Sequence, residues 1–320
     1  RWWSNAQAST AVAGEVLVSQ QYDLVIVGAG TAGSVLADRL TASGKLRVLL
    51  LEAGGAPSSR FVSIPAGFAK LFKGPLDWNF ETEPQAAVHG KRIYTPRGKM
   101  LGGCANMNAM MHQWCHPADF DGWAAAGATG WDWQSVAPAF RALESWSESA
   151  DPARGKHGPL RISANRNARK LTELWVQAAR ACGLGSDTEY NGRAFNGAWI
   201  AELAVRNGKR YSAYQACLKP AMQRPNLQVI TEAMVTGIVL EGARATGVRY
   251  RRGGVDACAS APKVVLAAGA AGSPQLLMLS GIGPGAQLQE FGIPLRVDAP
   301  EGGANLQDHP VRPRGVSTPS

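Results

Sequence analysis

The sequence lacks any long hydrophobic run. No apolar stretch approaches the ~20 residues that span a lipid bilayer, so we expect no integral membrane association. The first twenty residues, RWWSNAQASTAVAGEVLVSQ, also lack the apolar core of a signal peptide. They contain no initiator Met, which favours a mature end or a fragment of a longer gene product.

Cysteine is scarce as well. No CxxC pair occurs, and the five widely spaced cysteines are Cys104, Cys115, Cys182, Cys217 and Cys258. An odd count at such spacing argues against a disulfide framework, and a reducing compartment such as the cytoplasm fits this usage better.

Positive charge is in excess but is not concentrated. Lys and Arg number 33 against 24 Asp and Glu, which gives a net charge of +9, yet the basic residues are scattered. Because no Lys/Arg block or RNA-binding signature occurs, we expect no nucleic-acid partner. The excess instead favours anions in general, including phosphate-bearing cofactors. With 45% hydrophobic and 18% charged residues, the chain has the composition of a globular protein with a substantial core.

The sequence does contain a glycine-rich turn between two apolar runs. Leu24 to Val27 is a β-branched run typical of a buried parallel strand, and GAGTAG (residues 28–33) follows it at once. A helix pattern then opens, with an apolar face formed by Val35, Leu36 and Leu40. A second apolar run, Val48 to Leu51, ends in Glu52. Strand, glycines, helix, strand and acid in this order predict a dinucleotide-binding site.

Each element of this motif has a physical role. Gly28 permits the tight turn out of the strand, Gly30 lets a pyrophosphate approach the backbone, and Gly33 lets helix and strand pack closely. The helix N-terminus offers free N–H groups to the phosphates. Glu52 stands where an acid accepts hydrogen bonds from a ribose diol. This motif alone does not separate FAD from NAD.

Further segments resemble those of the glucose–methanol–choline (GMC) oxidoreductase family, in the family's order and at about its spacing. They are LDWNFETEPQ (76–85), PRGKMLGG (96–103), DFDGWAAAGATGWDW (119–133), RYSAYQACLKPAM (210–222), GAAGSPQLLMLSGIGP (269–284) and NLQDHP (305–310). The resemblance covers about residues 20 to 310. It implies an α/β fold, with a Rossmann-like FAD-binding domain and a portion of a smaller α+β substrate domain.

The resemblance also implies how FAD is held. The turn at 28–33 would contact the pyrophosphate, Glu52 the adenosine ribose, and the backbone of Val235 the adenine. Residues 97–103 would run along the cofactor, and residues 108–111 would lie beside the flavin ring. The expected cofactor-binding residues are Gly28, Gly30, Thr31, Ala32, Gly33, Glu52, Ala53, Trp78, Arg97, Met100, Leu101, Gly102, Gly103, Asn108, Ala109, Met110, Met111, Val235, Ala268 and Gly269.

The residues that follow PRGKMLGG (96–103) depart from the family pattern. Many relatives have two small hydroxyl residues after the glycine pair, where this chain has Cys104 and Ala105. A His that links the flavin covalently in some relatives would align with about Met107, which cannot form that bond. We therefore predict non-covalent FAD.

The run CANMNAMMHQWCH brings several metal-binding residue types close together. Cys104, His112, Cys115 and His116 do not have the spacing of a usual zinc site, and the run falls within the expected flavin-contact segment. We therefore expect no metal. For Cys104, a small buried side chain is favoured over a catalytic thiol because no partner base is evident.

Other conspicuous residues are expected to be structural. Met107, Met110 and Met111 are interpreted as packing residues. Trp123, Trp131 and Trp133 are expected to form an aromatic cluster, because no basic residues interleave them as on a base-stacking surface. The two histidines expected in solvated loops are His89 and His157.

The expected organisation is a discontinuous cofactor domain. The chain would divide into an N-terminal extension (1–19), a first FAD-binding segment (20–156), a substrate-domain segment (157–206), a second FAD-binding segment (207–310) and a tail (311–320). In the substrate-domain segment a helix is predicted from its apolar row, Leu171, Leu174, Trp175 and Ala178. Strands are predicted at 227–230 and 235–240, leading to 248–250.

The resemblance implies oxidation of a small-molecule alcohol or similar CH–OH donor, with hydride passing to flavin N5. The family's catalytic His, with a second His or an Asn, would lie beyond Ser320, so no catalytic residue is expected in this chain. His309 is interpreted as structural. Two hypotheses stay open, the N-terminal portion of an enzyme and a flavin-binding remnant without turnover. The substrate, the oligomeric state and the choice between oxidase and dehydrogenase are not predicted. Marginal stability is expected, because a missing strand would leave a sheet edge unpaired.

Overall fold

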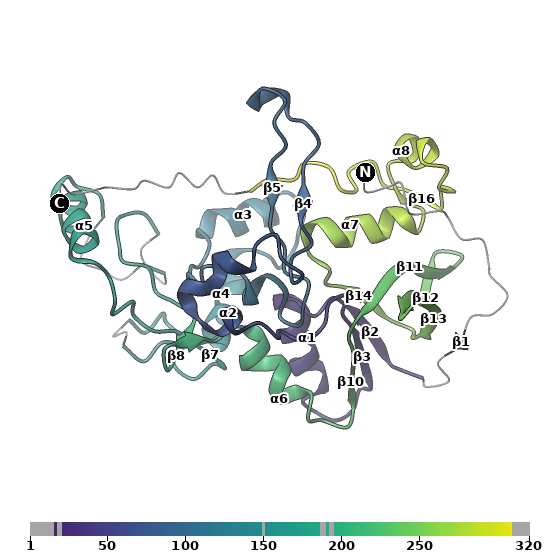
Figure 1. The fold of residues 1–320 in the computed structure, drawn as a ribbon, viewed down its shortest axis with the longest axis horizontal. Coiled ribbons are helices and arrows are strands. Elements are labelled where there is room, and N and C mark those ends of the chain that lie inside the picture. Colours follow the sequence, from purple (N-terminus) through teal and green to yellow (C-terminus); the bar gives the residue numbers. More distant parts are fainter. Residues whose placement is uncertain (1–15, 18–20, 149–150, 186–189, 192–194, 309–320) are drawn as a thin grey trace.

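The computed structural model describes residues 16–17, 21–148, 151–185, 190–191 and 195–308, and Figure 1 shows their arrangement. Their architecture is α/β, which confirms the predicted class. His309, the tail and most of the N-terminal extension lie outside the described residues. No helix in the described ranges is long and apolar enough to cross a membrane.

A parallel four-stranded sheet forms the centre of the fold. Its order is β10 (Leu227–Ile230), β3 (Val48–Leu51), β2 (Leu24–Val27) and β14 (Val264–Leu266). All residues of β2 and β3 are buried, as expected of continuous apolar runs in a parallel sheet. Within the described residues β14 pairs only with β2, so its outer edge is open.

Alternate residues of the two central strands face opposite layers. One core contains Val25, Val27, Leu49 and Leu51. The opposite core contains Leu24, Ile26, Val48 and Leu50. This alternation is the period of two that an extended strand imposes on its side chains.

A second, mainly antiparallel sheet lies against the first core. Its order is β1 (Val16–Leu17), β13 (Val255–Ser260), β12 (Arg244–Arg252) and β11 (Ala233–Glu241). The predicted strands at 227–230 and 235–240 are confirmed, but they belong to different sheets. The opposite face is covered by α1 (Thr31–Thr41) and α6 (Lys219–Ala221), as Figure 1 shows.

The remaining elements surround this centre. Between β3 and β10 come α2 (Arg60–Ser63), η1 (Pro65–Leu71), β4 (Phe80–Glu81), η2 (Ala86–Val88), β5 (Tyr94–Thr95), η3 (Gly103–Asn106), α3 (Pro117–Ala125), α4 (Trp133–Leu143), β6 (Glu144–Ser145), β7 (Leu160–Arg161), α5 (Lys170–Ala181), β8 (Val205–Arg206), β9 (Lys209–Arg210) and η4 (Tyr214–Leu218). After β14 come α7 (Gly269–Leu279), β15 (Ile282–Gly283), α8 (Gly285–Glu290) and β16 (Val297–Asp298).

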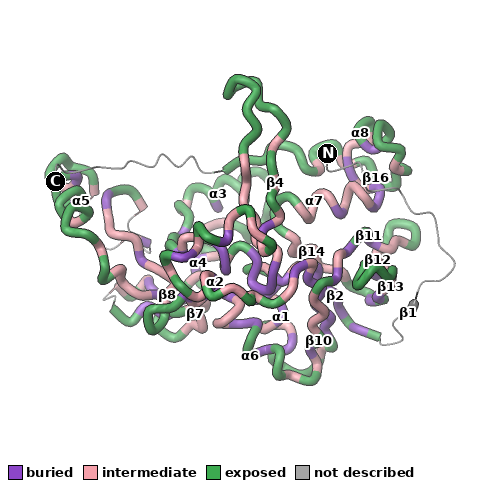
Figure 2. Tube along the Cα trace, in the orientation of Figure 1, coloured by how far each residue is buried: buried purple, intermediate pink, exposed green. Residues whose placement is uncertain are grey.

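The β4–β5 hairpin projects from the body of the molecule, and its tip is exposed in Figure 2. Asp77 fixes its base. The carboxylate accepts hydrogen bonds from the Tyr94 hydroxyl and, at 3.0 Å, from the Arg97 amide. Burial alone would raise the pKa of Asp77, but these and other hydrogen bonds lower it below its ordinary value.

The expected aromatic cluster is present around α3 and α4. Phe120 is its centre, with ring centroids 5.1 Å from Trp123 and 5.6 Å from Trp133. Trp131 packs edge-on against Trp123, at 6.1 Å. Trp123 and Trp131 are each about half exposed, so the cluster continues to the surface.

Several predicted burials are wrong. Cys104, expected to be buried, is exposed, and Met111 is 64% exposed although Met107 and Met110 are buried as expected. The helix predicted from an apolar row exists as α5, but the row itself is exposed (Leu171, Leu174, Trp175 and Ala178). Val176 and Ala179 are buried instead, because α5 packs through its other face. His89 and His157 are exposed, as predicted.

Candidate functional site

The glycine-rich turn connects β2 to α1. Gly28 has a φ of +100°, and a Cβ built on it would lie 2.5 Å from the Ala267 carbonyl oxygen. A Cβ on Gly33 would lie 1.9 Å from the Gly28 carbonyl oxygen. By contrast, a Cβ on Gly30 would meet nothing within 4 Å. Gly28 and Gly33 are therefore required by packing, whereas the space at Gly30 is open.

The N-terminus of α1 begins at this open position. Gly30 is the N-cap, and the first turn has neither a side-chain cap nor an acidic residue. Thr31 and Ala32 are exposed. Because the first amides of a helix have no intrahelical acceptor, this end presents donors and a positive dipole to a ligand.

Glu52 follows β3 as predicted, and its carboxylate already has backbone partners. Oε2 accepts a 2.8 Å hydrogen bond from the Ala29 amide, and Oε1 accepts a 2.9 Å bond from the Gly54 amide. Burial raises the pKa of Glu52 in spite of these bonds. Glu52 therefore fixes the turn in addition to the ribose contact expected of it.

The segment around the glycine pair reaches the same place from a distant region of the sequence. The Gly102 amide donates to the Ala29 carbonyl at 2.8 Å, and Leu101 donates to Gly55 at 3.0 Å. A Cβ on Gly103 would lie 2.9 Å from the Cα of Gly30. The segment thus lies directly against the turn, with both glycines at positive φ.

The ends of β11 and β14 complete this convergence. The Ala233 amide donates to the Glu52 carbonyl at 2.9 Å, and Val235 is buried two residues further along β11. The Cα of Ala268 would be 3.0 Å from a Cβ on Gly28, and Gly269 begins α7 beside it. Four predicted segments therefore meet at the carboxyl ends of the parallel strands, where α/β sheets bind ligands.

Residues 108–111 differ in how far their side chains are buried. Asn108 and Met111 are exposed, Ala109 is partly exposed and Met110 is buried. Met110 has a φ of +61°, an uncommon conformation for a residue with a side chain. It is held by hydrogen bonds from its amide to Asn108 Oδ1, at 3.0 Å, and from the Ala204 amide to its carbonyl, at 2.9 Å.

Other predicted residues have mainly structural contacts. The side chains of Met100 and Leu101 are buried in two hydrophobic clusters, so only their backbone is available to a ligand. The Trp78 amide donates to the Arg97 carbonyl at 2.8 Å, and the ammonium of Lys99 lies 4.8 Å from the centre of the Trp78 ring. The backbone of Ala53 supports the Glu52 carboxylate, since its hydrogen bond acts to lower the pKa of that group.

A buried charge cluster beside this region was not predicted. Arg154 donates to Glu144 at 2.9 Å and to Glu202 at 2.7 Å, and the ring of His112 lies 2.6 Å from Glu144. Burial alone would raise the pKa of Glu144, but hydrogen bonds from His112 and Arg154 lower it to about 2. The His112 amide also donates to the Glu202 carbonyl, so the cluster joins residues 108–112 to the segment before β8. Sequence spacing carries no signal for partners this far apart.

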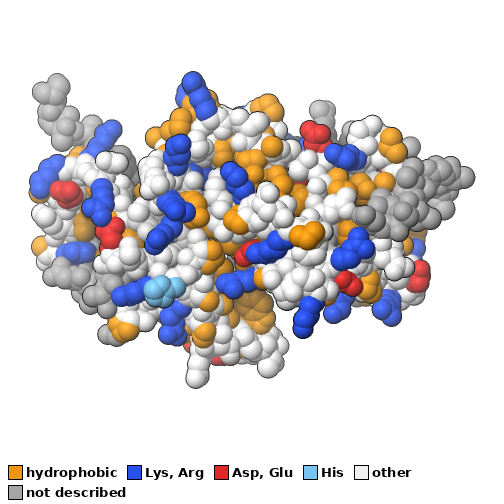
Figure 3. Space-filling view, turned by 90° about the horizontal axis from the view of Figure 1, so that it is seen from below, with side chains coloured by type: hydrophobic (Ala, Val, Ile, Leu, Met, Phe, Trp, Pro, Cys, Tyr) orange, Lys and Arg blue, Asp and Glu red, His pale blue; other side chains and the backbone are white. Residues whose placement is uncertain are grey.

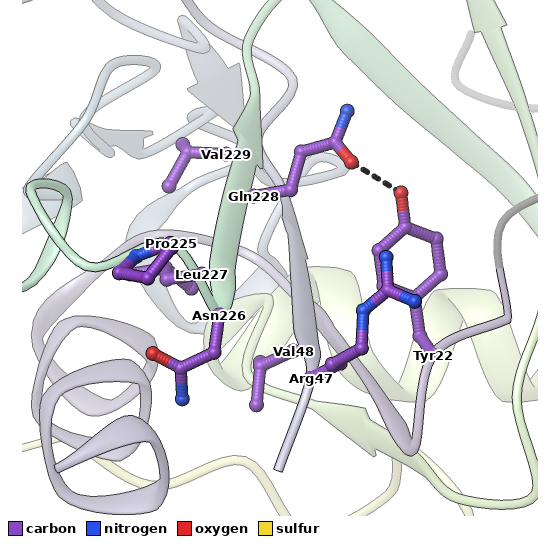
Figure 4. Close-up of a pocket in the computed structure, with 8 residues that line it drawn as sticks. All are labelled: Tyr22, Arg47, Val48, Pro225, Asn226, Leu227, Gln228 and Val229. Carbon is purple, nitrogen blue, oxygen red and sulfur yellow. Dashed lines mark hydrogen bonds between the residues drawn. The ribbon is translucent and has the colours of Figure 1, made fainter. Parts of the chain in front are cut away.

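A pocket of about 440 Å³ lies elsewhere (Figure 4). Tyr22, Arg47 and Asn226 line it, each just before one of the strands β2, β3 and β10. It therefore lies at the amino ends of the strands, opposite the glycine-rich turn. The Tyr22 hydroxyl bonds Gln228, and the Asn226 side-chain amide donates to the Thr41 and Leu46 carbonyls, so these groups join neighbouring elements to one another.

The described residues contain no group of three or more His, Cys, Asp or Glu arranged to hold a metal ion. On the face in Figure 3, Lys and Arg side chains are spread among hydrophobic ones and do not gather in one patch.

Comparisons with known proteins identify the family of the chain. Residues 22–311 match the family model described as GMC oxidoreductase. An uncharacterised GMC-type oxidoreductase of Mycobacterium tuberculosis is 44% identical over 296 residues, which are 91% of this chain and 56% of that protein. The oxygen-dependent choline dehydrogenase of Rhizobium rhizogenes is 38% identical over 291 residues, 90% of this chain and 53% of the relative.

Solved structures are also similar to this chain in fold. Pyridoxine 4-oxidase from Mesorbium loti has a TM-score of 0.81 at 34% identity, over 88% of this chain and 56% of that one. An FAD-dependent oxidoreductase from Chaetomium thermophilum has a TM-score of 0.80 at 30% identity, over 87% and 51%. The chain spans about half the length of the relatives that it matches. Together with the glycine-rich turn and its converging segments, this similarity shows that the chain belongs to the GMC oxidoreductase family.

Proposed function

We propose that this chain binds FAD and forms the flavin-binding portion of an oxidoreductase that acts on the CH–OH group of a small-molecule alcohol. The open space at Gly30, together with the uncapped N-terminus of α1, is the observation that carries the proposal. Packing leaves no room for a side chain at Gly28 or Gly33, whereas the protein leaves room for one at Gly30. Close approach of a ligand to the backbone therefore explains the glycine at position 30.

The residues of the chain fit FAD as follows. The amides of Thr31 and Ala32 would bind the pyrophosphate, and Glu52 would accept hydrogen bonds from the ribose. Asn108 and Met111 present an exposed surface for the flavin ring. When bound, FAD would supply the acceptor for hydride, while the chain binds and orients it. Retention of FAD by the purified chain tests this assignment.

The flavin is proposed to be held without a covalent bond. Met107 is buried and offers no nitrogen for a link to the flavin. Acid precipitation should therefore release the flavin into the supernatant. Yellow colour that stays with the precipitate would overturn this element of the proposal.

A second function is binding of flavin without turnover, and the position of His112 favours it for this chain alone. His112 is the nearest histidine in sequence to residues 108–111, and its ring is paired with buried Glu144. A general base must reach the alcohol proton, and with Nε2 held by Glu144 the ring of His112 has only Nδ1 for that role. Anaerobic addition of an alcohol panel distinguishes the two functions. Bleaching of the bound flavin by this chain would defeat the second, whereas a stable yellow band would support it.

A reducing, cytoplasmic location is proposed from the cysteines. All five are free, and three of them, Cys104, Cys115 and Cys182, are exposed. Exposed thiols persist most readily where the thiol pool is kept reduced. Fractionation of the native host, followed by detection with an antibody against the chain, tests this location.

A further inference from the structure

Arg210 is a buried cation next to the proposed flavin site. It lies in β9 and is 2% exposed. Its guanidinium donates to the Val62 carbonyl at 2.8 Å, the Ala105 carbonyl at 3.0 Å, Asn108 Oδ1 at 2.9 Å and the Asn108 carbonyl at 2.7 Å. The planar fork of arginine suits such a set of acceptors, and lysine cannot reproduce it.

All four acceptors of Arg210 are neutral oxygens. Arg154, by contrast, is paired with Glu144 and Glu202, and Arg224 is paired with Asp38. Burial lowers the pKa of Arg210 to about 10, which still leaves it charged at neutral pH. A buried charge without a carboxylate is unfavourable unless another negative group offsets it.

The position of this charge indicates which group that is. Asn108 is exposed on the surface proposed to face the flavin ring, and Arg210 lies directly behind it. Asn108 Oδ1 accepts from both Arg210 and the Met110 amide, so Arg210 also fixes the left-handed backbone at Met110. The side chain of Arg210 therefore supplies both a positive charge behind Asn108 and a hydrogen bond that fixes the backbone at Met110.

We propose that Arg210 is a positioning residue that holds residues 108–111 against the flavin and offsets the negative charge of the reduced flavin. This rests on the proposed FAD-binding function. Uptake of two electrons and one proton leaves one negative charge on the flavin ring. A buried cation behind Asn108 should therefore favour the reduced form over the oxidised form.

The test is the two-electron midpoint potential of FAD bound to the chain, titrated with dithionite and a reference dye. Arg210→Gln should weaken binding of reduced flavin relative to oxidised flavin by about tenfold, which is a potential about 30 mV lower. Arg210→Lys keeps the charge but loses the fork. It should keep a potential near that of the wild type while binding FAD more weakly in both states.

Arg224→Gln is the matched control. Arg224 also holds backbone and side-chain oxygens, at Asp38 and Thr41, but it does so on α1 away from residues 108–111. Its loss should reduce stability and leave the potential unchanged. If Arg210→Gln does not fold, Asn108→Asp places a carboxylate at the same acceptor position, and it should lower the potential in the same direction.

The outcomes separate the two proposals. A wild-type chain that fails to retain FAD counts against the proposed function. A wild-type chain that retains FAD, with an unchanged potential in Arg210→Gln or Asn108→Asp, overturns the role of Arg210. Equal weakening of oxidised and reduced FAD in Arg210→Gln also overturns it, because the charge would then act on a group outside the redox centre.

Discussion

A Cβ on Gly33 would lie 1.9 Å from the carbonyl oxygen of Gly28, whereas a Cβ on Gly30 would meet no protein atom within 4 Å. The two glycines of one motif are therefore needed for different reasons, and two substitutions should separate them. Gly33→Ala should destabilise the fold by about 2–3 kcal/mol, because the close packing of α1 on β2 cannot admit a methyl group.

Gly30→Ala is the companion variant. It should change the free energy of unfolding by less than about 1 kcal/mol, since its backbone has an ordinary φ of −69° and open space. FAD affinity should nevertheless fall by about tenfold or more, because the methyl group occupies the approach of the pyrophosphate. Urea unfolding and an FAD titration of both variants measure the two effects. Equal stability losses in the two would contradict the distinction.

Glu52→Gln tests the second role of this residue. The carboxylate accepts from the Ala29 and Gly54 amides, and a glutamine would point an N–H group at one of them. We expect a stability loss of about 1–3 kcal/mol, the cost of leaving a buried donor unsatisfied. Thermal melting of the FAD-free chain measures it. A melting temperature equal to that of the wild type would assign Glu52 to the ligand alone.

The buried charge cluster predicts an acid-sensitive fold. The pKa of Glu144 is lowered from 4.5 to about 2, so its contribution is present above about pH 4.5 and is lost as the pH falls through about 2. That loss should be about 3 kcal/mol in the wild type. Glu144→Gln, measured by urea unfolding at several pH values, should show a flatter profile over this range. Parallel profiles would exclude Glu144 as the source.

Removal of the central cation should be more severe. Arg154→Met leaves Glu144 and Glu202 buried without their cation, and breaking such a pair costs about 3–5 kcal/mol. The double variant with Glu144→Gln should recover some of that loss, because one buried carboxylate is then neutral. Unfolding free energies of the single and double variants test this coupling.

Features of the fold and the site could be predicted where the residues that form them lie close together in the sequence. The turn at 28–33 and the strand before Glu52 were predicted because strand, glycine and helix signals lie in one continuous stretch. The contacts of Arg210 and Arg154 were not predicted, since they join residues far apart in the sequence, such as Asn108 and Glu202.

Burial was the least predictable property. The row of apolar residues on α5 indicated a helix correctly, but periodicity says nothing about which face finds a partner. Leu174 and Trp175 are 47% and 56% exposed, while Val176 is buried. Cys104 was expected to be buried because of its residue type, yet it is exposed although the glycine pair before it is buried.

This exposed row gives a further prediction. Leu174→Glu should leave the free energy of unfolding within about 0.5 kcal/mol of the wild type, because the site is on the surface. Val176→Glu, two residues away but buried, should destabilise by several kcal/mol. Similar stability losses in both would contradict the packing of α5.

The central claim is that this chain binds FAD, and titration of the flavin-free chain with FAD tests it most directly. We predict saturable binding of one FAD per chain, followed by quenching of flavin fluorescence and accompanied by a rise in melting temperature. NAD should not compete, and Gly30→Ala should weaken the binding at unchanged fold stability. A folded chain that shows no saturable FAD binding would contradict the account.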